Sequence, residues 1–94
     1  MNFEYDPNKD RLNRERHGVD FAEAQELWRN PHVVLPARRV RGEERRMIVW
    51  TIEGKVFVAI FTVGSGWIRL ISCHRADARW EKIYEKYLAE ERPH

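Results

Sequence analysis

The stretch KVFVAIFTV at residues 55–63 decides how this chain can fold. Its residues are almost all β-branched or aromatic, a composition that predicts a β-strand. Apolar side chains would occupy both faces of such a strand: Val56, Val58 and Ile60 on one, and Phe57, Ala59 and Phe61 on the other. A sheet with one face in water would alternate apolar and polar residues, so both faces of this sheet need cover.

Three stretches of similar composition flank it: HVVLP at 32–36, RRMIVWTI at 45–52 and WIRLISC at 67–73. The connections between the last strands are short and rich in glycine. Because a parallel connection needs a dozen or more residues, these turns predict an antiparallel meander. A further segment, FEYD at 3–6, is too short to be more than an edge strand.

Two helices are predicted before the strands. Asp6 is a suitable N-cap and Gly18 a suitable terminator for a helix over residues 7–17. Asp20 opens a second helix over about 21–29, which a proline ends. The few residues between the two helices predict a tight helical hairpin or corner.

A third helix is predicted over residues 77–90, where aromatic and aliphatic residues follow one helical face. We therefore expect an α+β fold in one domain spanning residues 1–94. It would combine an N-terminal helical pair, a four-stranded antiparallel sheet with a possible short N-terminal edge strand, and a C-terminal helix. Either this helix covers the remaining apolar face of the sheet, or that face awaits a partner chain.

The cysteine and histidine content and the lack of long apolar stretches argue against disulfide-rich, metal-binding and membrane proteins. The lone Cys73 cannot form an intramolecular disulfide and suits a reducing compartment. The histidines and Cys73 lack the spacing of metal sites, so we expect no metal and no other cofactor. The sequence shows neither a signal peptide nor a membrane-spanning stretch, and we expect a cytosolic protein.

Basic residues concentrate in the middle of the chain, although the net charge is only +2. Residues 31–79 hold nine basic and four acidic residues, and most of the basic residues are arginines, which suit forked contacts to phosphate. The segment ARRVRGEERR at 37–46 contributes five of them: Arg38, Arg39, Arg41, Arg45 and Arg46. Such a cluster attracts anions, as nucleic-acid-binding surfaces do. The alternative is a solvated loop with internal Arg–Glu pairs, each worth about 0–1 kcal/mol.

The stretch RLISCHRAD at 69–77 carries a second concentration of polar side chains at the end of the last strand. Strict alternation would place Arg69 and Cys73 on one face and His74 on the other. We expect the turn into the last helix to swing His74 and Arg75 toward Arg69, with Glu43, Arg45 and Arg46 nearby. The alternative is that His74 and Arg75 are ordinary surface residues.

A third set of polar residues lies on the first predicted helix. Lys9, Asn13 and His17 recur every fourth residue and so project from one helical face. A solvated helix face would show the same pattern.

Arginines, imidazoles and a carboxylate are together the groups needed to cleave RNA through its own 2′-hydroxyl. One group removes the 2′ proton, another protonates the leaving 5′ oxygen, and fixed cations stabilise the charge on the phosphorus. The substrate would be RNA, because DNA lacks that internal nucleophile.

Several spaced motifs resemble the BrnT family of toxins: FEYDPNK at 3–9, RHGVDFAEA at 16–24, GEERR at 42–46, Thr62, and IRLIS with RA at 68–76. The resemblance implies a RelE-like ribonuclease fold and a growth-arresting toxin of a type II toxin–antitoxin pair. It also implies a BrnA-like antitoxin that neutralises the toxin by direct binding, in a toxin–antitoxin hetero-oligomer.

Carried over residue by residue, the family pattern implies six site residues: Lys9, His17, Glu43, Arg45, Arg69 and Arg75. Arg69 and Arg75 would stabilise the phosphate, Glu43 or His17 would be the base, and His74 could be the acid. Relatives more often read ISARRA where this chain reads ISCHRA, so His74 either takes over proton transfer or marks a weaker copy.

Two other classes of function compete with the nuclease. In the first, the basic surface only binds nucleic acid or an acidic antitoxin segment and cuts nothing. In the second, the protein is a DNA-binding repressor, which the lack of a basic recognition helix disfavours.

Overall fold

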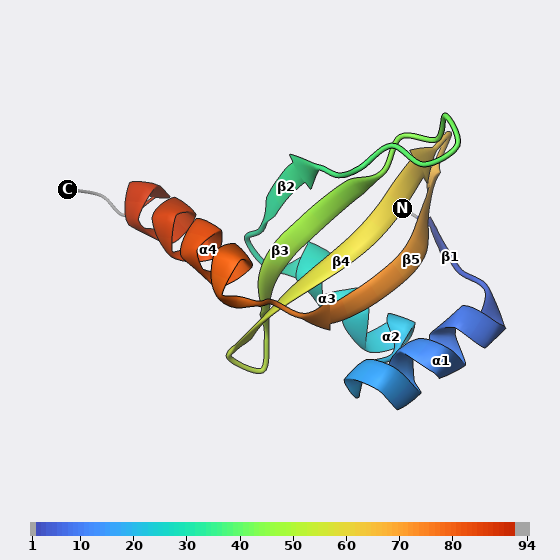
Figure 1. Ribbon diagram of the computed structural model, residues 1–94, viewed down its shortest axis with the longest axis horizontal. Helices are drawn as coiled ribbons and strands as arrows, with labels where there is room; N and C mark the ends of the chain where they lie inside the picture. Colours follow the sequence, from blue (N-terminus) through green and yellow to red (C-terminus); the bar gives the residue numbers. More distant parts are fainter. Residues whose placement is uncertain (1, 92–94) are drawn as a thin grey trace.

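The computed structural model describes residues 2–91 and contains a mixed sheet of five strands flanked by helices (Figure 1). The strands are β1 (Asn2–Glu4), β2 (Val33–Pro36), β3 (Arg46–Ile52), β4 (Lys55–Gly64) and β5 (Trp67–Arg75). Their order across the sheet is β1-β5-β4-β3-β2, with β4 in the middle. The stretch KVFVAIFTV therefore lies in the central strand of the sheet.

The predicted meander of four antiparallel strands is confirmed for β2 to β5. The prediction of a four-stranded antiparallel sheet is nevertheless wrong in one respect, because β1 adds a fifth strand that runs parallel to β5. This is the short N-terminal edge strand that FEYD allowed. It pairs at the far edge since the helices after it carry the chain across the sheet to β2 before the meander begins.

Within the described residues 2–91, four helices accompany the sheet: α1 (Pro7–His17), α2 (Phe21–Ala24), α3 (Glu26–Arg29) and α4 (Ala78–Glu91). Asp6 caps α1, whose end is closed by Gly18 at φ +72°, a left-handed conformation that glycine adopts readily. Asp77 caps α4 by accepting hydrogen bonds from the backbone N–H groups of Arg79 and Trp80. None of the helices in residues 2–91 has the length and apolar character needed to cross a bilayer.

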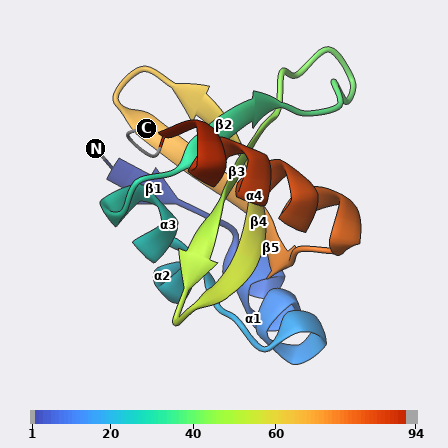
Figure 2. The same cartoon turned by 90° about the vertical axis from the view of Figure 1, so that its left-hand side faces the viewer.

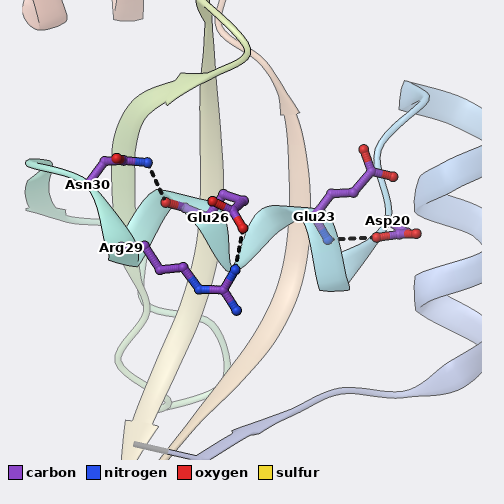
Figure 3. A network of polar contacts seen from close by, with 5 residues as sticks. All are labelled: Asp20, Glu23, Glu26, Arg29 and Asn30. Carbon is purple, nitrogen blue, oxygen red and sulfur yellow. Dashed lines mark hydrogen bonds and ion pairs between the residues drawn. The ribbon is translucent and has the colours of Figure 1, made fainter.

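The second predicted helix is divided in two at Gln25 (Figure 3). The N–H of Trp28 donates to the carbonyl of Gln25, three residues back, which tightens the backbone at the break. The first piece is capped by Asp20, which accepts from the N–H of Glu23 at 2.7 Å. The second piece is held by an Arg29–Glu26 ion pair, and its last turn by the Asn30 side chain, which donates to the carbonyl of Glu26.

The two faces of the sheet are covered unequally. The face that carries Phe57, Ala59 and Phe61, here called the helical face, packs against the first three helices and encloses the larger core. Phe21 and Leu27 are fully buried there. In Figure 1, α2 and α3 lie behind the sheet on this side.

The face that carries Val58 and Ile60, here called the open face, has less cover. Trp80 and Tyr84 of α4 pack with Val58 in a smaller core. Beyond these first turns α4 projects away from the sheet (Figure 1), and in the turned view of Figure 2 it lies in front of the strands. The helix that was expected to cover the second face therefore covers only part of it.

A β-bulge in β5 changes which side chains share a face. Ile60 pairs with Ser72, but the next residue, Phe61, pairs with Leu70, so Ile71 has no partner on β4. The extra residue lets both Leu70 and Cys73 enter the core. It also places Arg69, Ser72 and His74 together on the open face, because their partners on β4 are Thr62, Ile60 and Val58. Strict alternation, which separated Arg69 from His74, is therefore wrong.

Truncating Leu27 to alanine should lower the free energy of unfolding by about 2–5 kcal/mol, because it leaves a cavity beneath the helical face. Leu12→Ala is the matched control, since Leu12 is 36% exposed. Chemical denaturation of both variants checks this prediction. Equal losses of stability would show that the helical face is not the main core.

Candidate functional site

Arg69 and Arg75 do not converge. They lie six residues apart on β5, a separation of about 20 Å along a strand. Arg69 pairs with Thr62 on the open face, whereas Arg75 pairs with Phe57 on the helical face. The predicted pocket that holds both guanidinium groups is therefore wrong, and any site must be built from other neighbours.

A row of polar side chains crosses one end of the open face. Glu4 of β1 is in register with Arg69 of β5, which is in register with Thr62 of β4. Arg45 lies beside Thr62, because the next residue of its chain, Arg46, pairs with Phe61. The predicted approach of Arg45 to Arg69 thus agrees with the register, whereas Arg46 faces the helical side. Glu43 lies outside the paired strands, and its approach to Arg69 stays a prediction.

Both arginines of this row form ion pairs with neighbouring carboxylates. The Arg69 Nε donates to a Glu4 oxygen at 3.0 Å, and the Arg45 Nε lies 3.5 Å from a Glu43 oxygen. Two buried donors, the Arg45 Nε and the Thr62 hydroxyl, have no hydrogen-bond partner within residues 2–91. The charges of Arg45 and Arg69 are therefore paired within the row, while the Arg45 Nε and the Thr62 hydroxyl still lack hydrogen-bond partners.

Residues 37–46, here called the arginine-rich loop, form a tight hairpin. Val40 and Glu43 exchange two backbone hydrogen bonds around Arg41 and Gly42, both of which have positive φ. Arg39 pairs with Glu44 at 2.7 Å, which is one of the internal Arg–Glu pairs that a solvated loop predicts. Arg38, Arg41 and Arg46 are exposed and form no ion pair within residues 2–91.

A groove of about 310 Å³ runs between α1 and β5. Lys9, Arg16 and His17 line it from the helix, and Ile71 and Ser72 line it from the strand. The four-residue spacing predicted that Lys9 and His17 share a face, and the structure confirms this. Sequence reasoning missed Arg16 and Ser72, because no pattern showed that α1 lies against the bulge.

Asn13, the third member of this helical stripe, is buried and structural. Its side-chain NH₂ donates to the carbonyls of Cys73 at 2.7 Å and Val19 at 2.8 Å. Its side-chain oxygen accepts from the N–H of Cys73 at 3.0 Å. A solvated helix face is thus wrong for Asn13, which fastens α1 to the strand that carries His74.

Two imidazoles meet at the end of the groove. The ring centroids of His17 and His74 are 5.7 Å apart, with the planes at 50°. The His74 Nδ1 lies 3.0 Å from the carbonyl oxygen of Arg75, which can only accept, so Nδ1 carries a proton. The Nε2 of His74 is therefore the ring nitrogen left for contact with a ligand.

The pKa of His17 lies below its ordinary value. Loss of hydration lowers this pKa most, and the charges of His74 and Arg16 lower it further. Two neighbouring imidazoles of which one favours the neutral form can act as a base and an acid at the same pH.

Arg75 approaches His17 from the other side. Both residues line a hollow of about 220 Å³ with Glu23 and Lys55. The guanidinium of Arg75 lies 5.8 Å from the Phe57 ring centroid. Arg75 therefore belongs with the imidazole pair, whereas Arg69 belongs with the cross-strand row.

The family described as "Ribonuclease toxin, BrnT, of type II toxin-antitoxin system" matches residues 5–79. The chain belongs to the BrnT family. A search of curated proteins found no match. The BrnT match includes α1, β5 and the arginine-rich loop, and thus all the site residues described above except Glu4.

The side chains of this BrnT chain also bear on two other kinds of site, a metal centre and a cysteine nucleophile. Within residues 2–91, no three His, Cys, Asp or Glu side chains gather as metal ligands would. Burial, aided by Glu23, raises the pKa of the Cys73 thiol to about 12. Cys73 is therefore a core residue and a poor nucleophile.

Replacing His74 by glutamine should raise the pKa of His17, because a neighbouring positive charge is removed. The pKa should stay below the ordinary value, since burial is the larger cause. An NMR titration of the His17 ring measures both effects. His32→Gln is the control, because His32 is exposed and bonds to Asn30 instead. An unchanged His17 pKa in His74→Gln would contradict the contact between the rings.

Proposed function

We propose that this protein is the toxin of a type II toxin–antitoxin system and cleaves RNA by attack of the 2′-hydroxyl, without a metal ion. The observation that carries the proposal is the pair of facing imidazoles at the end of a groove lined by cations. Membership of a family of ribonuclease toxins supports it. The whole chain would act as one RelE-like domain in the cytoplasm.

In the proposed mechanism His17 is the base. Its lowered pKa keeps it neutral at physiological pH, so it can take the proton of the 2′-hydroxyl. The 2′ oxygen then bonds to phosphorus as the bond from phosphorus to the 5′ oxygen breaks. Protonated His74 donates its Nε2 proton to that 5′ oxygen. The products are a 2′,3′-cyclic phosphate and a 5′-hydroxyl.

Fixed cations would stabilise the charge on the phosphate during this step. Lys9 and Arg16 line the groove, and Arg75 lies behind His17. Such charges act without reorganising, which makes them effective in transition states. Glu43 is the other candidate base, but its pairing with Arg45 favours His17.

The rest of the RNA would follow the open face. The bulge places Arg69 on the same face as Ser72 and His74, so one strand of RNA could pass from the groove to the cross-strand row. Arg45 would contact the RNA in that row. The exposed loop arginines Arg38, Arg39 and Arg41 would add contacts beyond it, as would Arg46 at the start of β3 where RNA reaches the edge of the helical face.

The partner that neutralises the toxin would be a BrnA-like antitoxin, bound directly in a hetero-oligomer. The family is part of a toxin–antitoxin system, and α4 leaves part of the open face without cover. Leu35 on the edge strand β2 is in register with Met47 of the open face and is only partly buried, which offers apolar surface on that face.

A second candidate is an interaction module that binds RNA or antitoxin without cutting. The separation of Arg69 from Arg75 and the pairing of Arg69 with Glu4 favour it over the single pocket predicted from the sequence. Cleavage assays with purified protein distinguish the two functions.

His17→Gln and His74→Gln should each lower the rate of RNA cleavage by about 10²–10⁴-fold, the usual contribution of an acid or base. His32→Gln should cleave as fast as the unchanged protein. Gel analysis of a labelled RNA gives the rates, and analysis of the fragment ends should find the cyclic phosphate with a chelator present.

His17→Gln and His74→Gln should also fail to arrest growth on expression, whereas His32→Gln should arrest it. A co-expressed antitoxin should relieve the arrest caused by the unchanged toxin. If the unchanged protein leaves RNA intact, the interaction module is correct. If a chelator stops cleavage, the metal-independent mechanism is wrong.

Arg69→Gln should weaken RNA binding and reduce the slope of log affinity against log salt by about one, because one phosphate contact is lost. Glu4→Gln should have the opposite effect on affinity, since it frees the guanidinium of Arg69. Fluorescence anisotropy at several salt concentrations measures both. Arg11→Gln, on an exposed Arg11–Glu15 pair of α1, is the control. Equal effects of Arg69→Gln and Arg11→Gln would remove the cross-strand row from the RNA path.

A further inference from the structure

The edge of β5 is open where the two histidines meet. The pairing of β1 with β5 stops at Arg69, so the following residues of β5 have no strand on that side within residues 2–91. An unpaired buried backbone group is costly, and such groups in folded proteins find partners. At Cys73 the partner is the side chain of Asn13.

The Asn13 amide occupies the place of a neighbouring strand. It donates to the carbonyl of Cys73 and accepts from the N–H of the same residue, as a paired backbone would. Its second N–H bonds to the carbonyl of Val19, just beyond Gly18. The side chain is 5% exposed, so water does not compete for these bonds.

Both imidazoles are close to this contact along the chain. His17 follows Asn13 by one helical turn on the same face of α1, about 6 Å away. His74 follows Cys73 directly, at a Cα separation of about 3.8 Å. The hydrogen bonds that join α1 to β5 within residues 2–91 are both made by Asn13.

We propose that Asn13 is a positioning residue, whose amide fixes the spacing of His17 and His74 by locking α1 to β5. This inference rests on the proposed function of the imidazole pair. A shift of α1 along β5 by about 1 Å would change a separation of only 5.7 Å between the rings. Displacements of that size in an active site lower rates by about 10²-fold.

Asparagine can make these three hydrogen bonds at position 13, whereas aspartate and glutamine cannot make them in the same geometry. Aspartate offers only acceptors when ionised, and these would face the carbonyls of Cys73 and Val19. Glutamine keeps the amide but is longer by one methylene, so it would make the same bonds only with α1 displaced. Asn13→Gln therefore changes the spacing while it retains the hydrogen-bonding groups.

The decisive experiment measures the electrostatic coupling of the two rings by NMR. The His17 ring is titrated in the unchanged protein, in His74→Gln, in Asn13→Ala and in the double variant. We expect the change in His17 pKa caused by His74→Gln to shrink when Asn13 is replaced. The other charged groups around His17 are the same in all four proteins: Lys9, Arg16, Glu23, Glu53, Lys55 and Arg75.

Cleavage kinetics give the second measurement. Asn13→Ala and Asn13→Gln should lower kcat by about 10²-fold with little change in KM, because the RNA still meets the same cations. Glu15→Gln, on the exposed side of the same helix, is the matched control. If Asn13→Ala does not fold, Asn13→Gln carries both measurements, since its amide can still satisfy Cys73.

Two results would overturn the inference. One is an equal change of the His17 pKa on His74→Gln with and without Asn13. The other is a kcat per folded molecule that Asn13→Gln leaves unchanged. Failure of the proposed function would look different, since the unchanged protein would then leave RNA intact or His17→Gln would cleave RNA as fast as the unchanged protein, whatever the coupling of the rings.

Discussion

One unpaired residue in β5, Ile71, determines which side chains share a surface. Without this bulge, Leu70 and Cys73 could not both point into the core, because residues three apart on a regular strand face opposite sides. Burial of both side chains favours the irregular strand over the regular one. The same irregularity brings Arg69 and His74 onto one face, although their separation along the chain is odd.

Beyond β1 the outer edge of β5 has unpaired backbone groups, and α1 supplies a hydrogen-bond partner for them. β1 covers only the beginning of β5, so the backbone of Cys73 needs a partner from elsewhere. Asn13 supplies it, and the same contact brings His17 to His74. A structural requirement, satisfaction of a buried backbone, thus places two titratable groups side by side.

The charges of the molecule are arranged more locally than its net charge shows. Arg45, Arg69 and Arg39 each have a carboxylate within 3.5 Å, so part of the basic middle segment is neutralised. Lys9, Arg16 and Arg75 instead line hollows beside the imidazole pair. Cations therefore lie beside the imidazole pair as well as in the arginine-rich loop.

The sequence alone determined most of the secondary structure and the family. The helix over residues 7–17, the central strand and the antiparallel meander follow from local signals, because caps, turns and side-chain periodicity act over a few residues. Tertiary structure decided the division of the second helix at Gln25, the pairing of β1 and the bulge at Ile71. It also decided that Arg75 lies with His17 and not with Arg69. These features depend on which distant backbones and side chains meet, and a β-strand changes the face of every later residue when one residue is left unpaired.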